Sequence, residues 1–222
     1  MIEVHAIHSG NRYLYQEVLE QHYRIRHDIY VGERRWMDLE RPDGREVDQF
    51  DTDEAVYLLG VEPGAGVVAG SRLVPTTEPH LMSEVFPELA NVRGLPRAPD
   101  VFEWTRIFVV PARRESHRPS SAAGIIYGGI VEFCLAQEIR RLSVVCEAYW
   151  IPRLAQIGWR PRLLGEPIEK DGMTIVGITV DMTREALDMT RSVYGIGRSV
   201  LAEEDARVKL PQREWDRAAA VN

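Results

Sequence analysis

Apolar residues recur along the chain in two patterns, one typical of strands and one typical of helices. Runs that alternate or are continuously apolar predict strands at 1–8, 55–62, 66–76, 101–111, 143–149 and 173–181. Apolar residues at steps of three and four predict helices at about 11–34, 120–141, 151–157 and after 181. Pro63-Gly64-Ala65 joins the second and third strands and predicts a hairpin.

Two long stretches have no convincing period. Residues 35–52 are polar and contain Pro42 and Gly44, and residues 77–100 follow Pro75 and contain four more prolines. Loops this long within a compact domain are usually functional or disordered. We expect residues 35–52 to tighten when a ligand binds.

The order of elements predicts an α/β fold, an α+β three-layer sandwich in which a mixed sheet carries helices on both faces. This is the acetyltransferase-like arrangement, in which acyl thioesters enter where two central strands splay apart. That comparison concerns the fold and does not by itself give function. No repeat or linker divides the chain, so we expect a single domain over 1–222, with a peripheral charged tail from about 202.

Composition narrows the class of protein. The chain has 222 residues, 45% of them hydrophobic, which suits a globular protein with a sizeable core. No apolar run approaches the roughly 18–20 residues of a membrane span, and the N-terminus does not resemble a secretion signal. Cys134 and Cys146 lie in apolar surroundings and are expected to be structural thiols. These features predict a cytoplasmic protein.

Charge and histidine spacing exclude further classes. The net charge of −7 argues against a nucleic-acid binder, whose surface would be basic. The six histidines show neither paired spacing nor nearby cysteines, so no metal site is expected.

One candidate site lies at the end of the first predicted helix and in the loop after it. Arg26 and Tyr30 are four residues apart and share a helix face, and Trp36, Asp48 and Asp51 follow. Aromatic rings attract a cation and stack a base, while carboxylates oppose positive charge, so the set suits a sulfonium cation that carries adenine. Taken singly, each residue could equally belong to the surface or the core.

A second candidate site places charged residues inside apolar strands. Glu103 and Arg106 lie in the strand 101–111, and Arg72 lies in 66–76. Buried charges are paired or used, so these residues form either a structural ion pair or a carboxylate clamp with a proton acceptor. Residues 103 and 106 point to opposite faces of a regular strand. Both can line one site only if a bulge intervenes or the site wraps the strand.

A third candidate is the basic loop before the helix at 120–141. Arg113, Arg114, Arg118, Ser120 and Ser121 bring cations and backbone N–H groups together at a helix start. This suits the phosphates of coenzyme A or of a phosphopantetheine arm. A capped helix with a solvated basic loop is the equally weighted alternative.

In combination, these residues resemble the N-acyl-homoserine lactone synthases, the autoinducer synthase family. The similarity covers about residues 20–110, and each motif is weak by itself. The matching motifs are Arg26-x-x-x-Tyr30, Trp36, Glu46-x-Asp48-x-x-Asp51, Gly70-Ser71-Arg72-Leu73, Val85-Phe86-Pro87 and Glu103-x-Thr105-Arg106.

The resemblance implies an acyltransferase that makes a quorum-sensing signal. The amine of S-adenosylmethionine would attack an acyl thioester, and the methionine carboxylate would then close the lactone and expel methylthioadenosine. Glu103 would accept a proton, directly or through a water, and Arg106 would orient the substrate carboxylate. The S-adenosylmethionine site and its loop would comprise Arg26, Tyr30, Trp36, Asp48, Asp51, Arg72 and Phe86.

The resemblance also bears on the acyl donor. The chain is similar to the branch that uses coenzyme A donors with short branched or aryl groups such as isovaleryl-CoA, with acyl carrier protein as the alternative donor. No prosthetic group is implied. The acyl pocket would include Trp104, Thr105, Cys146, Tyr149 and Trp150. The donor phosphates would meet Arg113, Arg114, Arg118 and Ser120.

Two departures from the family pattern concern acyl preference rather than activity. Tyr30 stands where the family usually has Phe, and Ile107 stands where Phe commonly follows the Arg.

Two other functions compete with a synthase. A plain N-acetyltransferase would normally have a glycine-rich loop before the helix, whereas no glycine precedes Gly124 there. A sensor that binds an adenosyl ligand through Trp36 would leave Glu103 and the basic loop without a purpose.

Overall fold

The computed structural model describes residues 1–115, 120–207 and 210 of the chain. Its strands form one sheet in the order β1-β2-β3-β4-β5-β8-β6, with β7 paired to β8. The strands are β1 (Glu3–Ile7), β2 (Val56–Glu62), β3 (Gly66–Pro75), β4 (Val101–Val109), β5 (Arg141–Glu147), β6 (Arg162–Leu163), β7 (Ile168–Lys170) and β8 (Met173–Asp181). The β4–β5 pair is parallel and the neighbouring β3–β4 and β5–β8 pairs are antiparallel, so the sheet is mixed as predicted.

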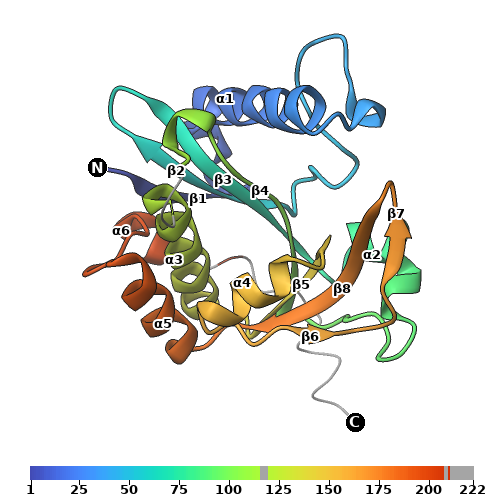
Figure 1. Cartoon of the computed structure of the whole chain (residues 1–222). Helices are drawn as coiled ribbons and strands as arrows, with labels where there is room; N and C mark the ends of the chain where they lie inside the picture. The colour runs from blue at the N-terminus through green and yellow to red at the C-terminus, as the bar shows by residue number, and fades with distance from the viewer. Residues whose placement is uncertain (116–119, 208–209, 211–222) are drawn as a thin grey trace, which may run out of the picture.

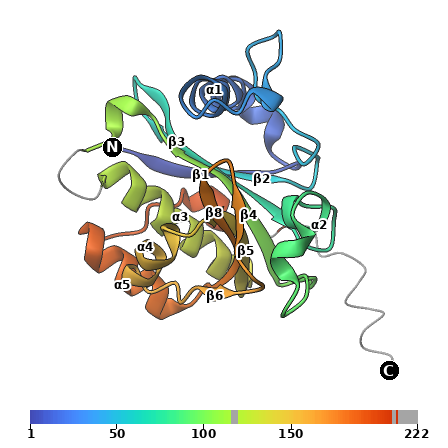
Figure 2. The same ribbon diagram turned by 45° about the vertical axis from the view of Figure 1, so that its right-hand side comes forward.

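Helices cover both faces of this sheet (Figures 1 and 2). The helix α1 lies over one face, and α3 and α5 lie over the other. The helices are α1 (Gln16–Arg26), which continues as a π-helix (His27–Glu33), α2 (Leu81–Glu84), α3 (Ser121–Ala136), α4 (Trp150–Gln156), α5 (Arg184–Tyr194) and α6 (Glu203–Arg207). In the part of the chain that the structure describes, none of them has the length and apolar character to cross a bilayer.

The larger core lies between the sheet and α3, most of whose residues are apolar and buried. Two glycines let α3 approach its neighbours closely. A Cβ at Gly124 would meet the Tyr194 side chain at 2.3 Å, and one at Gly129 would meet Val4 at 2.7 Å. A smaller core packs α1 and the π-helix against the other face.

The sheet opens between its two parallel strands. β4 and β5 pair only where Val101–Glu103 faces Arg141–Ser143. Beyond that point β4 continues along β3 and β5 continues along β8, so the two strands diverge. This is the splayed arrangement expected from the element order.

β4 also bulges in the diverging part. Thr105 faces Arg72 and Phe108 faces Gly70, so Arg106 and Ile107 together oppose one residue of β3. Arg106 adopts φ 55°, a left-handed conformation that is uncommon for a residue with a side chain. The bulge is one of the conditions under which residues 103 and 106 can serve one site.

Several predicted boundaries were wrong. The second predicted helix ends at Ala136 instead of 141, because Glu138 turns the chain with φ 61° and Arg141 begins β5. The short strands β6 and β7 were not expected, and the proline-rich stretch contains α2.

The predicted peripheral tail begins too early. Ala202 and Asp205 are only 3% and 4% exposed. The carboxylate of Asp205 accepts a hydrogen bond from the Ala6 backbone N–H at 3.2 Å, which ties α6 to β1. The rest of that tail, 208–209 and 211–222, lies outside the described residues.

Candidate active site

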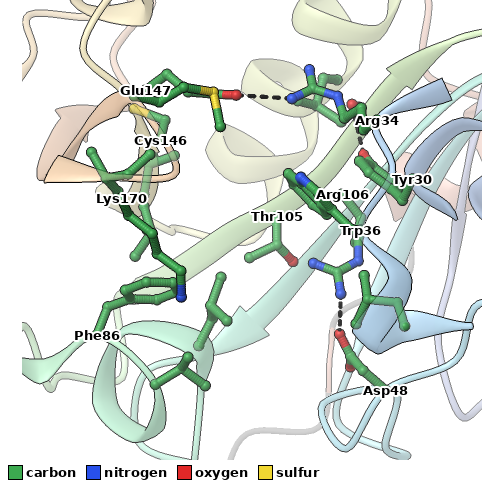
Figure 3. A pocket seen from close by; sticks show the side chains of 18 of the residues that line it. Tyr30, Arg34, Trp36, Asp48, Phe86, Thr105, Arg106, Cys146, Glu147 and Lys170 are labelled. Carbon is green, nitrogen blue, oxygen red and sulfur yellow. Dashed lines mark hydrogen bonds and ion pairs between the residues drawn. The ribbon is translucent and has the colours of Figure 1, made fainter.

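A cavity of about 680 Å³ lies where β4 and β5 diverge. The strands supply one side of it, the segment after the π-helix supplies another, and α2 and the β7–β8 hairpin supply the rest (Figure 3). The lining includes the predicted site residues Tyr30, Trp36, Asp48, Phe86, Trp104, Thr105, Arg106, Cys146 and Trp150. Residues predicted from two distant halves of the chain therefore meet at one opening.

Tyr149, also predicted for the acyl pocket, is not part of the lining. Its ring is 45% exposed and stacks on Trp150 from outside, with ring centroids 6.0 Å apart. The chain turns at Tyr149 into α4, so its side chain leaves the strand direction that carries Cys146 into the cavity.

Three arginines and three carboxylates form a connected network beneath the cavity. Arg26 binds both oxygens of Asp51, at 2.7 and 2.9 Å, and Glu46 at 2.5 Å. Arg72 binds both oxygens of Asp48, at 2.6 and 3.0 Å, and contacts Asp51 at 2.9 Å. These paired contacts match the fork of a guanidinium to a carboxylate and are the strong form of ion pair.

Arg106 completes the network from the bulge of β4. Its Nε and Nη2 bind Glu46, each at 3.0 Å, and Nη2 also binds Asp48 at 2.7 Å. Its third nitrogen, Nη1, makes no hydrogen bond to the residues described, and Figure 3 shows the guanidinium at the cavity surface beside Thr105. Arg106 therefore presents a donor to whatever occupies the cavity.

The network fastens the long loop to three separate elements. Arg26 comes from α1, Arg72 from β3 and Arg106 from β4, while the acidic partners come from the loop. Arg26 and Arg72 are fully buried and lie outside the cavity lining, so they position the loop without reaching the cavity.

Burial alone would raise the pKa of Asp51, but Arg72 and Arg26 outweigh it and hold that pKa well below the usual range. Burial likewise opposes ionisation of Glu46, yet hydrogen bonding to Arg106 and the charge of Arg26 lower its pKa. Both carboxylates are therefore charged at neutral pH.

These depressed pKa values predict acid sensitivity of the fold. The stabilisation is complete above the unfolded-state pKa of about 4 and is lost as pH falls through the folded-state pKa. We expect the free energy of unfolding to decline steadily below about pH 5, as measured by urea unfolding at a series of pH values. Arg26→Met should show a shallower decline, because Asp51 and Glu46 lose a shared partner. An identical pH dependence in the variant would contradict this account.

An aromatic wall, formed by Tyr30 and Trp36, lies against the network at the cavity. The rings of Tyr30 and Trp36 stack with centroids 5.1 Å apart and an angle of 18° between their planes. Arg106 lies 5.4 Å over the Tyr30 ring, and Arg34 lies 5.5 Å over Trp36. Tyr30 belongs to the π-helix, a rare form that is frequent at functional sites.

Tyr30 and Ile107, the two positions that depart from the family pattern, contact each other through the Tyr30 hydroxyl. This hydroxyl donates a hydrogen bond of 2.9 Å to the backbone carbonyl of Ile107, which lies within the bulge of β4. Burial raises the pKa of Tyr30 to about 12, so the hydroxyl stays protonated as a donor.

Comparison with known proteins decides the family. The autoinducer synthase family model matches residues 11–189. The isovaleryl-homoserine lactone synthase of Bradyrhizobium diazoefficiens is 44% identical over 95% of this chain and 93% of that protein. The chain belongs to the autoinducer synthase family. The family and the enzyme class predicted from the sequence motifs, an acyl-homoserine-lactone synthase, are thereby confirmed.

Solved structures support the same family assignment. A coenzyme-A-dependent acyl-homoserine lactone synthase, BjaI, solved with SAM and isopentyl-CoA, matches with a TM-score of 0.85 at 44% identity, covering 93% of this chain and 97% of that one. An N-acetyltransferase from Lactobacillus plantarum matches in fold alone, with a TM-score of 0.53 at 17% identity, covering 82% of this chain and 99% of that one. The acetyltransferase-like fold is therefore confirmed.

Within this autoinducer synthase fold, Glu103 does not reach the cavity. It is fully buried, and its oxygens accept hydrogen bonds from the backbone N–H groups of Leu81 and Met82, both at 2.7 Å. His80 Nδ1 lies 3.1 Å from the same carboxylate. The start of α2 thus binds both of its oxygens, and the role of Glu103 as proton acceptor, directly or through a water, stays a prediction. Glu103 also holds α2, whose neighbour Phe86 forms a cavity wall.

Three of the predicted donor-phosphate residues, Arg113, Arg114 and Ser120, are described by the structure and lie outside the cavity lining. Arg113 pairs with Glu62 at 2.5 Å, and Arg114 pairs with Glu33 at 2.6 Å. Ser120 caps α3 by accepting from the Ala123 backbone N–H. Arg118 lies outside the described residues. A phosphate role for this loop stays a prediction.

Four further residues join the site that sequence reasoning did not select. Glu46 was noticed only as part of a motif, although its position two residues before Asp48 was a usable signal. Arg34 and Glu147 form an ion pair of 2.9 Å at the cavity, and Lys170 lies 5.0 Å over the ring of Phe86 (Figure 3). Arg34 and Glu147 are 113 residues apart in the chain, and Lys170 and Phe86 are also far apart in sequence. No local sequence pattern therefore predicts either contact.

Proposed function

We propose that this chain makes an acyl-homoserine lactone from S-adenosylmethionine and the coenzyme A thioester of a short branched acyl group, with isovaleryl-CoA as the first candidate. The observation that carries the proposal is the cavity at the β4–β5 opening, lined in one place by an aromatic wall and an available arginine donor. Family membership and the 44% identity to an isovaleryl-homoserine lactone synthase support it.

S-adenosylmethionine would occupy the side of the cavity nearest the acidic loop. Trp36 and Phe86 would enclose its adenosyl part, since aromatic faces stack on a base and attract a sulfonium. Arg106 Nη1 would bind the methionine carboxylate, and Asp48 would contribute negative charge. Arg26, Arg72, Asp51 and Glu46 would act as positioning residues under this surface.

The acyl group would lie between the diverging strands. Trp104, Thr105, Cys146 and Trp150 line this part of the cavity together with Leu154. Trp104 in turn packs on Trp159, with ring centroids 5.3 Å apart, so the pocket is backed by large rings. Such a closed end favours short branched or aryl groups over long chains.

The reaction would proceed in two bond-forming steps. The neutral amine attacks the thioester carbon, the C–S bond breaks, and the thiol leaves as the amide forms. The carboxylate then attacks the methionine carbon next to the sulfonium, which closes the lactone and releases methylthioadenosine. An α-amino group has a pKa of about 7.7–8.0, so a substantial neutral fraction exists near neutral pH.

Coenzyme A is proposed as the donor on the similarity to BjaI, and acyl carrier protein remains the alternative partner. We place the reaction in the cytoplasm, because both proposed substrates are cytoplasmic metabolites. We also propose that residues 1–222 act as a single domain, since one sheet joins the first strand to the last.

The decisive assay follows free thiol and methylthioadenosine together, with S-adenosylmethionine and a panel of acyl-CoAs. We expect equal amounts of both products with isovaleryl-CoA. Thiol without methylthioadenosine would indicate a plain N-acetyltransferase. Absence of both products with every acyl-CoA, but activity with acyl carrier proteins, would assign the other donor.

The two free cysteines, one at the cavity and one away from it, allow a test of the acyl pocket. Cys146 lines the cavity, whereas Cys134 is buried in α3 away from it. We expect Cys146→Leu to lower kcat/KM for isovaleryl-CoA relative to acetyl-CoA by about 10-fold or more, because added carbons occupy acyl space. Cys134→Ala should leave the ratio of the two kcat/KM values unchanged. A ratio unchanged in both variants would place the acyl group elsewhere.

A further inference from the structure

His80 is a buried histidine in direct contact with Glu103. Its Nδ1 lies 3.1 Å from Glu103 Oε1, and the two side chains are 2% and 1% exposed. The backbone N–H groups of Leu81 and Met82 donate to the same carboxylate, and such donors favour its charged form. An ionised carboxylate can only accept hydrogen bonds, so Nδ1 of His80 carries a proton and donates it to Oε1.

The two oxygens of Glu103 have different surroundings. Oε1 accepts from His80 and from the Met82 N–H, whereas Oε2 accepts from the Leu81 N–H. Leu81 lines the active-site cavity, and so does Thr105, which follows two residues later on the same face of β4. Oε2 is therefore the oxygen with more acceptor capacity left, and it lies behind a residue of the cavity surface.

His80 does not line the active-site cavity but a second cavity of about 160 Å³. The charged residues in the lining of that second cavity are Glu78, Glu84 and Arg97. The backbone at His80 is fixed by a hydrogen bond of 3.0 Å from its N–H to Ser83 Oγ. The imidazole is thus held against the buried carboxylate, and it can influence the reaction only through Glu103.

We propose that His80 is a positioning residue for the reaction. Its Nδ1–H holds Oε1 of Glu103 and keeps the carboxylate ionised, so that Oε2 accepts the proton of the substrate amine through one water. The inference rests on the proposed function and on the proton-accepting role predicted for Glu103.

The proton transfers balance as follows from this geometry. The ammonium of S-adenosylmethionine gives one proton to the water, which passes one of its own to Oε2 of Glu103. The freed electron pair attacks the thioester carbon. As the C–S bond breaks, a second N–H proton goes to the departing thiolate, so the products are an amide and a thiol. Glu103 then returns its proton to solvent.

The hydrogen bond from His80 should set the pH range of the reaction. Val74 and Ser143, which pair with Glu103 on β3 and β5, carry no charge, so His80 is the titratable neighbour that the surrounding strands do not replace. Without the Nδ1 donor, Glu103 takes up a proton from solvent at a higher pH. A protonated carboxyl cannot accept a proton from the amine. The acid limb of the rate profile should therefore move to higher pH.

The test compares His80→Asn with His80→Gln by following thiol release from isovaleryl-CoA over a series of pH values. Asparagine places its amide nitrogen where Nδ1 lies, whereas glutamine places it near the position of Nε2. We expect His80→Gln to move the acid limb of kcat up by about one pH unit, which is a tenfold loss at a given pH on that limb. His80→Asn should recover most of this loss. KM for S-adenosylmethionine should change little in either variant, because His80 does not line the cavity.

Ser83→Ala is the control for disturbance of α2. It removes the hydrogen bond to the His80 N–H and leaves the three donors to Glu103 in place. We expect a lower Tm in this variant with no movement of the acid limb. If His80 served only to stabilise α2, the Asn and Gln variants would lose kcat equally at every pH, and the proposal would be wrong.

Two further outcomes separate this proposal from the ones it rests on. Glu103→Gln should lower kcat by about 10²-fold or more, the lower range of general-base catalysis. Unchanged kcat there would overturn the proton-accepting role of Glu103 and the role of His80 with it. Wild-type protein inactive with acyl-CoAs and with acyl carrier proteins would instead overturn the proposed function. Thermal unfolding of each variant distinguishes loss of folding from loss of chemistry.

Discussion

Replacing Arg26 by methionine is expected to lower the free energy of unfolding by about 3–5 kcal/mol, the cost of leaving buried partners of an ion pair uncompensated. Arg26 is fully buried, and its substitution strands Asp51 and Glu46 in the interior. For a chain of this size that corresponds to a Tm lower by roughly 6–20 °C.

A neighbouring ion pair on the same helix supplies the control. Arg24 pairs with Glu20 at 2.8 Å, but their side chains are 58% and 40% exposed. Arg24→Met should change the free energy of unfolding by less than about 1 kcal/mol, since solvent screens an exposed pair. Equal Tm changes in the two variants would show that burial does not set the importance of Arg26.

Arg106→Lys is expected to lower kcat/KM for S-adenosylmethionine by about 10²–10³-fold. Lysine keeps the charge but cannot bind Glu46 and Asp48 while also presenting a donor to the cavity. The loss of hydrogen bonds between charged groups, at about 1.5–3 kcal/mol each, accounts for this range. Steady-state rates with each substrate varied in turn measure the effect, and KM for the acyl donor should change little.

The matched control for Arg106 is Arg162, an exposed arginine on β6 that pairs with Asp181 away from the cavity. Arg162→Lys should retain wild-type kinetics. If Arg106→Lys also retained kcat/KM for S-adenosylmethionine, the carboxylate-binding role would be excluded, and Arg106 would serve only to position the loop.

Arg34 and Glu147 illustrate why some of the residues that line the cavity could not be predicted from the sequence. Their side chains meet across 113 residues of chain, and the contact depends on β5 ending beside the π-helix. Glu147 is the last residue of an apolar strand, a position at which a glutamate commonly lies at the surface. Without the topology, nothing distinguishes it from a solvated residue.

Glu103 shows how far a local pattern can go. Its place in an apolar strand correctly indicated a buried charge, but the backbone N–H groups that bind it were not foreseen. The two N–H groups that hold it belong to a four-residue helix inside a proline-rich stretch, and so short a helix has no periodicity to detect.

The sequence by itself determined the six long strands, the long first helix and the burial of the charged residues Arg72, Glu103 and Arg106 within apolar strands. Local periodicity reports which face of a strand or helix is apolar, and a charge within such a face must find a partner. The family motifs in the sequence also placed a set of charged residues in one site: Arg26, Asp48, Asp51, Arg72 and Arg106. The tertiary structure decided which of these reach the cavity, because register, the β4 bulge and the divergence of β4 from β5 depend on contacts between distant segments. The same contacts turned Glu103 toward α2 and brought Glu147 to the opening.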